Sequence, residues 1–403
     1  MIVGIPAEIK SAEKRVAMSP ANVQSLTDKG VKVLFQTNAG DAAGYPDALY
    51  TAAGATLSSD RAEIFAQADI ILQVQSFGSN NENSEADLAS LRSGQVVIGM
   101  MDPLASPQAA QAVADKGATA IALELVPRIS RAQSMDVLSS MATLAGYKAV
   151  LMGASASPRI FPMLMTAAGT LQPARVLIMG VGVAGLQACA TAKRLGAVVE
   201  AYDVRPAARE QIISVGAKPV ELDLDTGESE GAGGYAKAQG EDFLQRQREL
   251  MTAVVAEQDI IITTAAIPGA KSPILVTEDM VKAMKPGSVI VDLAAERGGN
   301  CDLTEQGKTV VAHGVTILGP ENVPSELAYH ASQMYGKNMQ TLLELILDDE
   351  GNLNLDFNDE IVAGTVVAHK GEVPHPHMRK LLGLPEIKAS EPEPEPETEA
   401  QGE

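Results

Sequence analysis

Three glycines at the spacing of a phosphate-binding turn give the clearest chemical signal in this sequence. The glycines are Gly180, Gly182 and Gly185. They follow a strand-like apolar run, Arg175–Met179, and open a stretch of helical periodicity, Ala184–Leu195. In such a unit the first glycine permits a tight turn, the second lets a pyrophosphate approach the backbone, and the third lets the helix pack closely on the sheet. The helix N-terminus then offers unpaired amides and a partial positive charge to the phosphates.

An acidic residue stands where a dinucleotide-binding turn needs one. Asp203 directly follows the next predicted strand, Val198–Tyr202, about 20 residues after the glycines, where an acid accepts hydrogen bonds from the adenosine ribose. Its charge would repel a 2′-phosphate, so the pattern predicts NAD rather than NADP, although Arg205 nearby could soften that preference. The alternative is a purely structural glycine turn with an aspartate cap, and the combination of strand, turn, helix and acid favours the cofactor.

Two further segments are expected to reach the same cleft. Ile262–Gly269 runs from a strand end into a turn that contains Ala266, Pro268 and Gly269, and ligands of open α/β sheets bind at such strand ends. Leu222–Asp242 is acidic and rich in glycine, so it could close over a ligand. The alternatives are an ordinary turn for the first segment and an inert surface loop for the second.

A third segment concentrates polar groups at the entrance to a long predicted helix. The helix is expected from Asp136 to about Gly153, and Arg128, Gln133, Asp136 and Ser139 lie at or just before its start. An amide, a hydroxyl, an acid and a guanidinium group could hold a nicotinamide carboxamide and its ribose. Alternatively, Asp136 could merely cap the helix and Arg128 could pair with it.

Elements of both types alternate along the whole chain, and this alternation predicts the fold class. Strand–helix alternation implies right-handed crossovers, so we expect an α/β protein of two Rossmann-like, doubly wound parallel-sheet domains with a cleft between them. The first domain should combine residues 1–135 with 325–383, and the NAD(H)-binding domain should span 136–324. Further strands are expected at Ile2–Ile5, Val31–Phe35, Ile70–Val74, Val96–Met100, Thr119–Leu123, Ile260–Thr263, Val289–Asp292, Val315–Leu318 and Ile361–His369. Further helices are expected at Pro20–Lys29, Asp60–Ala68, Pro107–Lys116 and Leu327–Leu347, the last packing back on the first domain, and an exposed loop at Gly78–Glu85.

Composition excludes several classes of partner. The formal net charge of −20 argues against direct binding of nucleic acid or anionic lipid, and we expect a disordered acidic tail at 384–403. Cys189 and Cys301 lack a CxxC spacing, which fits a reducing cytoplasm. The first residues reach charged side chains too early for a signal peptide, and the uncharged run Val176–Ala192 is short and broken by glycines. These features predict a soluble, cytoplasmic protein.

The distribution of acid–base residues narrows the chemistry. All five histidines lie at position 313 or later, outside most of the first predicted domain. His375 and His377 lie in a proline-rich stretch, and we predict no metal site there. An enzyme that oxidises an alcohol or amine moves a proton along with the hydride and needs a placed acid or base. Hydride transfer between two nicotinamides exchanges no proton at the reacting carbons, so orientation and water exclusion suffice.

The first twenty residues, MIVGIPAEIKSAEKRVAMSP, resemble the start of alanine dehydrogenases. Those enzymes carry a catalytic Lys and His at the ends of two first-domain strands, but Leu72–Phe77 and Ile98–Pro103 contain neither. Arg15 matches a ligand of the substrate carboxylate in that family. A closer resemblance, over about residues 1–380, is to alpha subunits of proton-translocating NAD(P)+ transhydrogenases in their soluble, split-subunit form. The motifs that carry it are RISRAQSMDVLSS, GVGVAGLQACATAKRLGAVV, GGYAK, TTAAIPG and KPGSVIVDLAAERGGN.

This resemblance implies a role for each site residue. Arg128, Gln133, Asp136 and Ser139 would hold the nicotinamide end, with Gln133 orienting the ring. Val183 and Ala184 would face the pyrophosphate, and the adenosine ribose would meet Asp203, Val204 and Arg205. The remaining wall would comprise Gly234, Gln247 and Ala266, with Tyr235 on a closing loop.

The resemblance also implies partners. NADP would be bound by a partner beta subunit, and a membrane-spanning subunit would couple hydride transfer to proton translocation. The chain would form a homodimer in the cytoplasm, peripheral to the inner membrane, and its acidic tail resembles the end of the split-subunit form.

Two other functions remain open. An amino-acid dehydrogenase like alanine dehydrogenase could use Lys10 or Tyr45 as its acid or base, and it would oxidise NADH with pyruvate and ammonia. A catalytically silent NAD(H)-sensing module would bind NADH tightly without transferring hydride.

Overall fold

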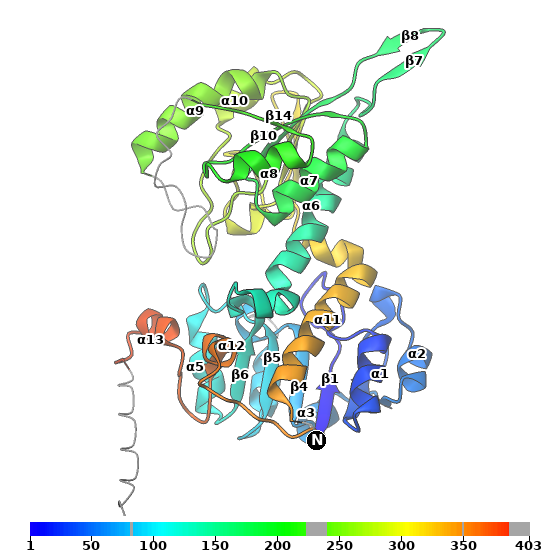
Figure 1. Ribbon diagram of the computed structural model, residues 1–403, viewed down its shortest axis with the longest axis vertical. Coiled ribbons are helices and arrows are strands. Elements are labelled where there is room, and N and C mark those ends of the chain that lie inside the picture. Colours follow the sequence, from blue (N-terminus) through cyan, green and yellow to red (C-terminus); the bar gives the residue numbers. More distant parts are fainter. Residues whose placement is uncertain (81–83, 223–239, 349, 387–403) are drawn as a thin grey trace, which may run out of the picture.

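The chain folds into two lobes, each built around its own mostly parallel sheet (Figure 1). The computed structural model describes residues 1–80, 84–222, 240–348 and 350–386. Both lobes have helices on the faces of the sheet, as the strand–helix alternation predicts. The expected α/β fold of two parallel-sheet domains is therefore confirmed.

The first lobe contains a seven-stranded sheet with the order β16-β6-β5-β4-β1-β2-β3. Five consecutive neighbours pair in parallel, and only β16 runs antiparallel, against β6. Its central strands are apolar and buried on both faces because helices cover both sides. The strands are β1 (Ile2–Ile5), β2 (Lys32–Gln36), β3 (Thr56–Ser58), β4 (Ile70–Gln75), β5 (Val96–Met100), β6 (Thr119–Ala122) and β16 (Val366–Ala368). The helices are α1 (Pro20–Asp28), α2 (Asp47–Ala52), α3 (Arg61–Gln67), α4 (Glu85–Ser90), α5 (Pro107–Asp115), α12 (Glu360–Thr365) and α13 (Pro376–Leu382).

The second lobe contains a seven-stranded sheet with the order β11-β10-β9-β12-β13-β15-β14. The chain leaves β9 toward β10 on one side and returns to β12 on the other, so a crevice forms where these strands end. Only β14, at the edge, runs antiparallel. The strands are β9 (Arg175–Met179), β10 (Val198–Tyr202), β11 (Lys218–Pro219), β12 (Ile260–Thr263), β13 (Val289–Asp292), β14 (Thr309–Ala312) and β15 (Val315–Leu318). The helices are α7 (Val183–Arg194), α8 (Ala208–Ser214), α9 (Glu241–Ala256) and α10 (Glu278–Ala283).

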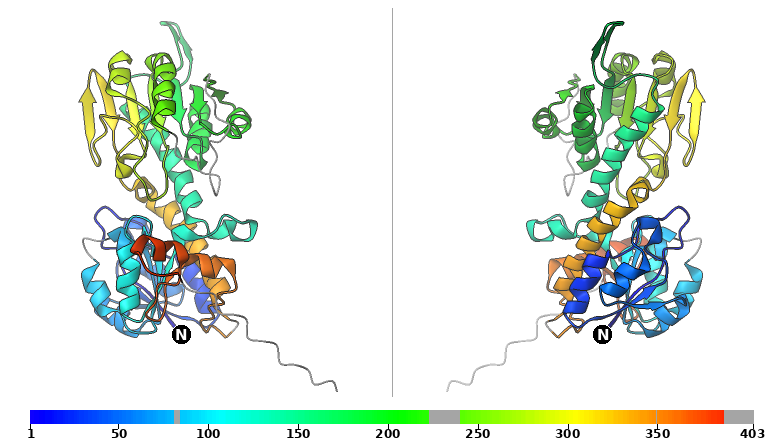
Figure 2. Two further views of the ribbon diagram at one scale, coloured as in Figure 1. Left: turned by 90° about the vertical axis from the view of Figure 1, so that its left-hand side faces the viewer. Right: turned by 90° about the vertical axis from the view of Figure 1, so that its right-hand side faces the viewer.

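Two long helices cross between the lobes (Figure 2). Helix α6 (Val137–Ala156) leads into the second lobe, and α11 (Ala328–Ile346) returns to the first. Tyr335 and Met339 of α11 are fully buried in the core of the first lobe, so the predicted return of this helix is confirmed. Within the described residues, α6 alone has the length and apolarity of a membrane span, and its packing against α7, α11 and β13 gives its apolar side chains partners inside the chain.

A thin hairpin of β7 (Leu164–Thr166) and β8 (Gly169–Leu171) projects away from the second lobe (Figures 1 and 2). All six of its strand residues are exposed, including Met165 with 77% of its surface accessible. The sequence analysis did not predict this arm.

Two expectations were wrong. Ile361–His369 is not one strand, because Asp359 caps a helix by accepting a hydrogen bond from the amide of Ile361 at 2.7 Å, and only Val366–Ala368 pairs with β6. The segment Gly78–Glu85 is not an exposed loop in its described part, since Gly78 and Asn80 are buried within a 3-10 helix, Phe77–Asn80. The other predicted strands and helices are present within about two residues of their expected ends.

Candidate functional site

A cavity of about 710 Å³ opens at the carboxyl ends of β9, β10 and β12. This volume lies within the range of pockets that hold small molecules and cofactors. Its walls come from α6, the glycine turn, the segment after β10, α9 and the segment after β12. The lining residues include Arg128, Ser139, Gly180, Gly182, Val183, Ala184, Tyr202, Asp203, Val204, Arg205, Gln247, Thr264, Ala266, Lys271, Pro273 and Leu275.

The glycine turn has the geometry that its spacing predicts. Gly180 has a φ of +93°, in the region that glycine adopts without strain. A Cβ at Gly185 would lie 2.0 Å from the carbonyl oxygen of Gly180, so only glycine lets α7 sit this close to the turn. By contrast, a Cβ at Gly182 would meet nothing within 4 Å, because this residue faces open space at the start of α7. The first turn of α7 is thus open to a phosphate group.

Asp203 ties the glycine turn to the segment after β10. Its Oδ2 accepts a hydrogen bond from the amide of Val181 at 2.7 Å. Arg205 donates to the same carboxylate from its backbone amide, Nε and Nη2, at distances of 2.8–2.9 Å. Because the side chain of Asp203 is only 6% exposed, these bonds are shielded from water. The predicted ribose-binding acid is therefore fixed beside the phosphate turn.

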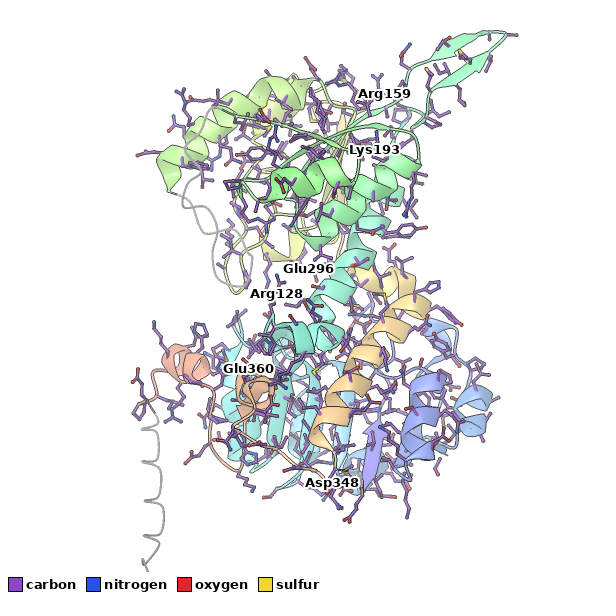
Figure 3. The ribbon with its side chains drawn as sticks, viewed as in Figure 1. Arg128, Arg159, Lys193, Glu296, Asp348 and Glu360 are labelled. Carbon is purple, nitrogen blue, oxygen red and sulfur yellow. The ribbon has the colours of Figure 1, made fainter. Side chains whose placement is uncertain are left out.

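The entrance to α6 shows which of its polar groups reach the cavity. Arg128 and Ser139 line it, whereas Gln133 and Asp136 do not. Asp136 accepts hydrogen bonds from the amide of Ser139 at 2.9 Å and from its hydroxyl at 2.6 Å, so it caps the helix as the alternative interpretation expected. Gln133 lies exposed in the 3-10 helix Ser130–Met135 that precedes the cap. Figure 3 places Arg128 at the gap between the lobes, near Glu296 of the second lobe.

The wall after β12 is held by buried polar residues that the sequence analysis did not single out. Asn300 is fully buried; it accepts from the amide of Ala265 at 3.0 Å and donates to the carbonyl oxygens of Ala265 and Pro273 at 2.9 and 2.8 Å. Asp292, also fully buried, accepts from the amide of Asn300 at 2.7 Å. The hydroxyl of Thr264 donates to the carbonyl of Gly180 at 2.8 Å and joins this wall to the glycine turn.

Comparison with known proteins covers nearly the whole chain. A family model described as Alanine dehydrogenase/PNT, N-terminal domain, matches residues 4–145, and one described as Alanine dehydrogenase/PNT, C-terminal domain, matches residues 149–376. The chain belongs to the alanine dehydrogenase/PNT family. The family resemblance inferred from the sequence motifs is therefore confirmed.

Relatives within this family differ in how similar they are. The first segment of the split NAD(P) transhydrogenase subunit alpha of Rhodospirillum rubrum is 48% identical over 378 residues, which cover 93% of this chain and 98% of that protein. Alanine dehydrogenase of Bacillus subtilis is 30% identical, with 97% of each chain covered. A solved structure of transhydrogenase from Sinorhizobium meliloti has a TM-score of 0.82 and 45% identity, covering 93% of this chain and all of that one. An L-alanine dehydrogenase structure with a TM-score of 0.77 and 24% identity shares the fold.

Arg15, which matches a substrate ligand of alanine dehydrogenases, lies in the first lobe of this family member and does not line the cavity. It is 2% exposed and donates to Glu13 through Nε at 2.7 Å and Nη2 at 2.6 Å. Burial opposes ionisation of Glu13, but Arg15 holds the pKa of that carboxyl down to about 2. Lys10 and Tyr45 do not line the cavity either, and the Tyr45 hydroxyl donates to the carbonyl of Tyr329 at 3.0 Å.

The predicted site residues of this family member thus fall into three groups. Those that line the cavity are Arg128, Ser139, Gly180, Gly182, Val183, Ala184, Asp203, Val204, Arg205, Gln247 and Ala266. Those described but not lining it are Gln133, Asp136, Gly185, Pro268 and Gly269. Gly234 and Tyr235, with most of the predicted closing loop, lie outside the described residues. Gln247 is 2% exposed and its Oε1 has no hydrogen-bond partner among the described residues, which leaves an acceptor available in this wall.

Proposed function

We propose that this chain is the NAD(H)-binding component of an NAD(P) transhydrogenase, and that it transfers hydride from NADH to NADP+ held by a partner subunit. The observation that carries the proposal is the cavity in which the glycine turn and Asp203 meet. The 48% identity to a relative named as a transhydrogenase alpha subunit supports it. A parallel-sheet crevice with this turn and acid favours NAD(H) as the ligand.

The residues that line the cavity fit a reaction without proton transfer at the reacting carbons. Within the described residues, the lining includes neither histidine nor glutamate. NADH supplies a hydride from C4 of its nicotinamide, and NADP+ accepts it at the same position, so one ring is oxidised as the other is reduced. The chain's residues then need only bind, orient and exclude water.

Each wall of the cavity receives a task in this proposal. The amides at the start of α7, with Val183 and Ala184, bind the pyrophosphate, and Asp203 binds the adenosine ribose. Arg128 and Ser139 bind the nicotinamide end, because they line the wall formed by the entrance to α6. Gln133 orients the ring and Asp136 supports it by fixing the start of α6, a step that brings the exposed Gln133 toward the cavity when NADH is bound.

Partner subunits complete the proposal. NADP(H) binds to a separate beta subunit, and a membrane-spanning subunit couples the reaction to proton translocation, so this chain works at the cytoplasmic side of the inner membrane through them. The name of the Rhodospirillum rubrum relative, which divides subunit alpha into segments, supports such an assembly. We also propose a homodimer, in which a second copy covers the exposed arm formed by β7 and β8.

Reconstitution with an NADP(H)-binding transhydrogenase subunit tests this function. We expect NADH binding by the chain alone, and transfer to an NADP+ analogue only with the partner. Gln133→Asn should lower the transfer rate sharply while NADH affinity changes little, because orientation rather than binding is lost. Gln306→Asn, an exposed amide change on another surface, is the matched control. NADH binding without transfer in any competent reconstitution would leave only a silent NAD(H)-binding module.

A further inference from the structure

The two lobes meet at an ion pair away from the helices that connect them. Nη2 of Arg297, in the second lobe, lies 2.6 Å from Oδ1 of Asp102, in the loop that follows β5 of the first lobe. Leu104 of the same loop lies against the second lobe, since a Cβ at Gly269 would be 2.8 Å from the Cβ of Leu104. The loop after β5 thus contacts the second lobe at two points.

On the second lobe, Arg297 is bonded to the wall of the cavity. Its carbonyl oxygen accepts from the amide of Ser272 at 2.9 Å. Ser272 lies between Lys271 and Pro273, both of which line the cavity. A displacement of Arg297 therefore acts on the segment after β12 that encloses the ligand.

On the first lobe, Asp102 is held in place from below. Its φ of +47° lies in the left-handed region, which carries strain for a residue other than glycine. The amides of Met101 and Asp102 donate to Oε1 of Glu124 at 2.7 and 2.8 Å, and this buried carboxyl group fixes the turn. Asp102 therefore presents its carboxylate to Arg297 from a preorganised loop.

The strength of the ion pair suits a contact that opens and closes. The two side chains are 39% and 30% exposed, so water and salt weaken their attraction. The gap at which they meet is where Figure 3 places Glu296, the neighbour of Arg297, near Arg128. A second ion pair, Lys148 with Glu326 at 2.9 Å, joins α6 to the segment before α11 and therefore lies at the connecting helices.

We propose that Asp102 and Arg297 form a latch across the cleft, which keeps the segment after β12 closed on bound NAD(H) and slows its release. This inference rests on the proposed function only in taking NAD(H) as the ligand of the cavity. The two residues are positioning residues, because they act on the cavity wall and do not line the cavity themselves.

Stopped-flow measurement of NADH dissociation from the full chain tests the latch. Asp102→Asn tolerates the left-handed backbone and removes only the charge, and Arg297→Met keeps the length of the exposed side chain. We expect either variant to release NADH about three to five times faster, with the association rate little changed. The reversed pair, Asp102→Arg with Arg297→Asp, should release NADH within about twofold of the wild-type rate. Arg209→Gln, which breaks an exposed ion pair within the second lobe, is the control and should change nothing.

Salt provides a readout that a merely structural role would not move. Raising ionic strength from ~0.05 to ~0.5 M should speed release from the wild type and erase its difference from both single variants. Unchanged release in both single variants, with NADH still bound, would refute the latch and leave the proposed function standing. A reversed pair as fast as the single variants would refute it as well. Failure of the wild type to bind NADH would instead remove the proposed function and the latch with it.

Discussion

Arg205 and Asp203 form a complete local network at the ribose end of the cavity. Oδ1 of Asp203 accepts from the amide and Nε of Arg205, each at 2.9 Å, while Oδ2 accepts from Nη2 of Arg205 at 2.8 Å and from the amide of Val181 at 2.7 Å. Since a carboxylate has about four acceptor sites, these donors fill it. A ribose diol must therefore displace the guanidinium group of Arg205, while the two backbone amides keep Asp203 in place.

This network predicts how the chain distinguishes NADH from NADPH. In Asp203→Asn, the loss of a charged acceptor should weaken NADH binding about 10- to 100-fold, and removal of repulsion should strengthen NADPH binding. Fluorescence titration with each cofactor measures the two dissociation constants. Glu221→Gln is a suitable control, because Glu221 also pairs with an arginine but at the surface. An unchanged ratio of the two constants would show that Asp203 does not select the cofactor.

The contact between α6 and α7 predicts a second outcome. A Cβ at Gly146 would lie 2.0 Å from the carbonyl oxygen of Ala184, so Gly146→Ala forces α6 away from the start of α7. Overpacking of this kind costs about 1–3 kcal/mol, and a domain of this size loses roughly 2–4 °C of Tm per kcal/mol. NADH binding should weaken too, because the first turn of α7 faces the phosphates.

Gly364→Ala is the matched control for this helix contact, since its Cβ would have no neighbour nearer than 3.8 Å. Thermal unfolding and NADH titration of both variants give the comparison. Equal melting temperatures for the two would contradict the account of the α6–α7 contact.

Buried carboxyl groups in the first lobe predict the pH dependence of stability. Burial, and then repulsion from Glu13, raises the pKa of Glu8 from 4.5 to about 8, although the amides of Val74 and Gln75 donate to it. Between these two values the folded chain keeps a proton that the unfolded chain has lost, so the free energy of unfolding should fall as pH rises from 4.5 to 8. Glu8→Gln should flatten this slope. Burial also raises the pKa of Glu124 to about 7, so a shallower decline should remain up to that pH.

Urea unfolding of the wild type and Glu8→Gln across the range from about pH 5 to pH 8 measures the slope. Parallel declines for the two proteins would show that Glu8 is not the group responsible.

The exposed arm predicts the oligomeric state. Met165 and Leu171 are 77% and 51% exposed on the hairpin, and burying them against a second copy would remove this apolar surface from water. Met165→Glu with Leu171→Glu should therefore convert a homodimer into monomers in sedimentation velocity. Val311→Glu places the same charge at a residue that is 70% exposed on β14, and should leave the dimer intact. A double variant that still sediments as a dimer would exclude the arm as the interface.

Sequence patterns predicted most of the fold because the central strands are buried on both faces. Arg175–Met179 and Val96–Met100 match their strands residue for residue, since continuous apolar runs between turns leave few alternatives. The short segment Ile361–Ala368 was less determined. Its apolar residues fit either element, and the cap by Asp359 decides for a helix over its first half.

The site was predictable where it depends on local order along the chain. The glycine turn and Asp203 form one strand–turn–helix–strand unit, so their spacing carries the information. Asn300 and Asp292 hold the opposite wall through contacts that arise only once β12 and β13 pair, and a single buried amide leaves no periodic signal. For the same reason the ion pair of Asp102 and Arg297 was not predicted, because these residues are 195 positions apart.

The most direct test of the central claim follows a deuterium label at C4 of NADH, on the face that is transferred. The chain is mixed with this NADH, NADP+ and an NADP(H)-binding transhydrogenase subunit in ordinary water, and mass spectrometry locates the label. Direct transfer predicts that the deuterium appears in NADPH without dilution by solvent hydrogen, and only when both proteins are present. Label lost to solvent, or no labelled NADPH with a competent partner, would contradict hydride transfer from this cavity.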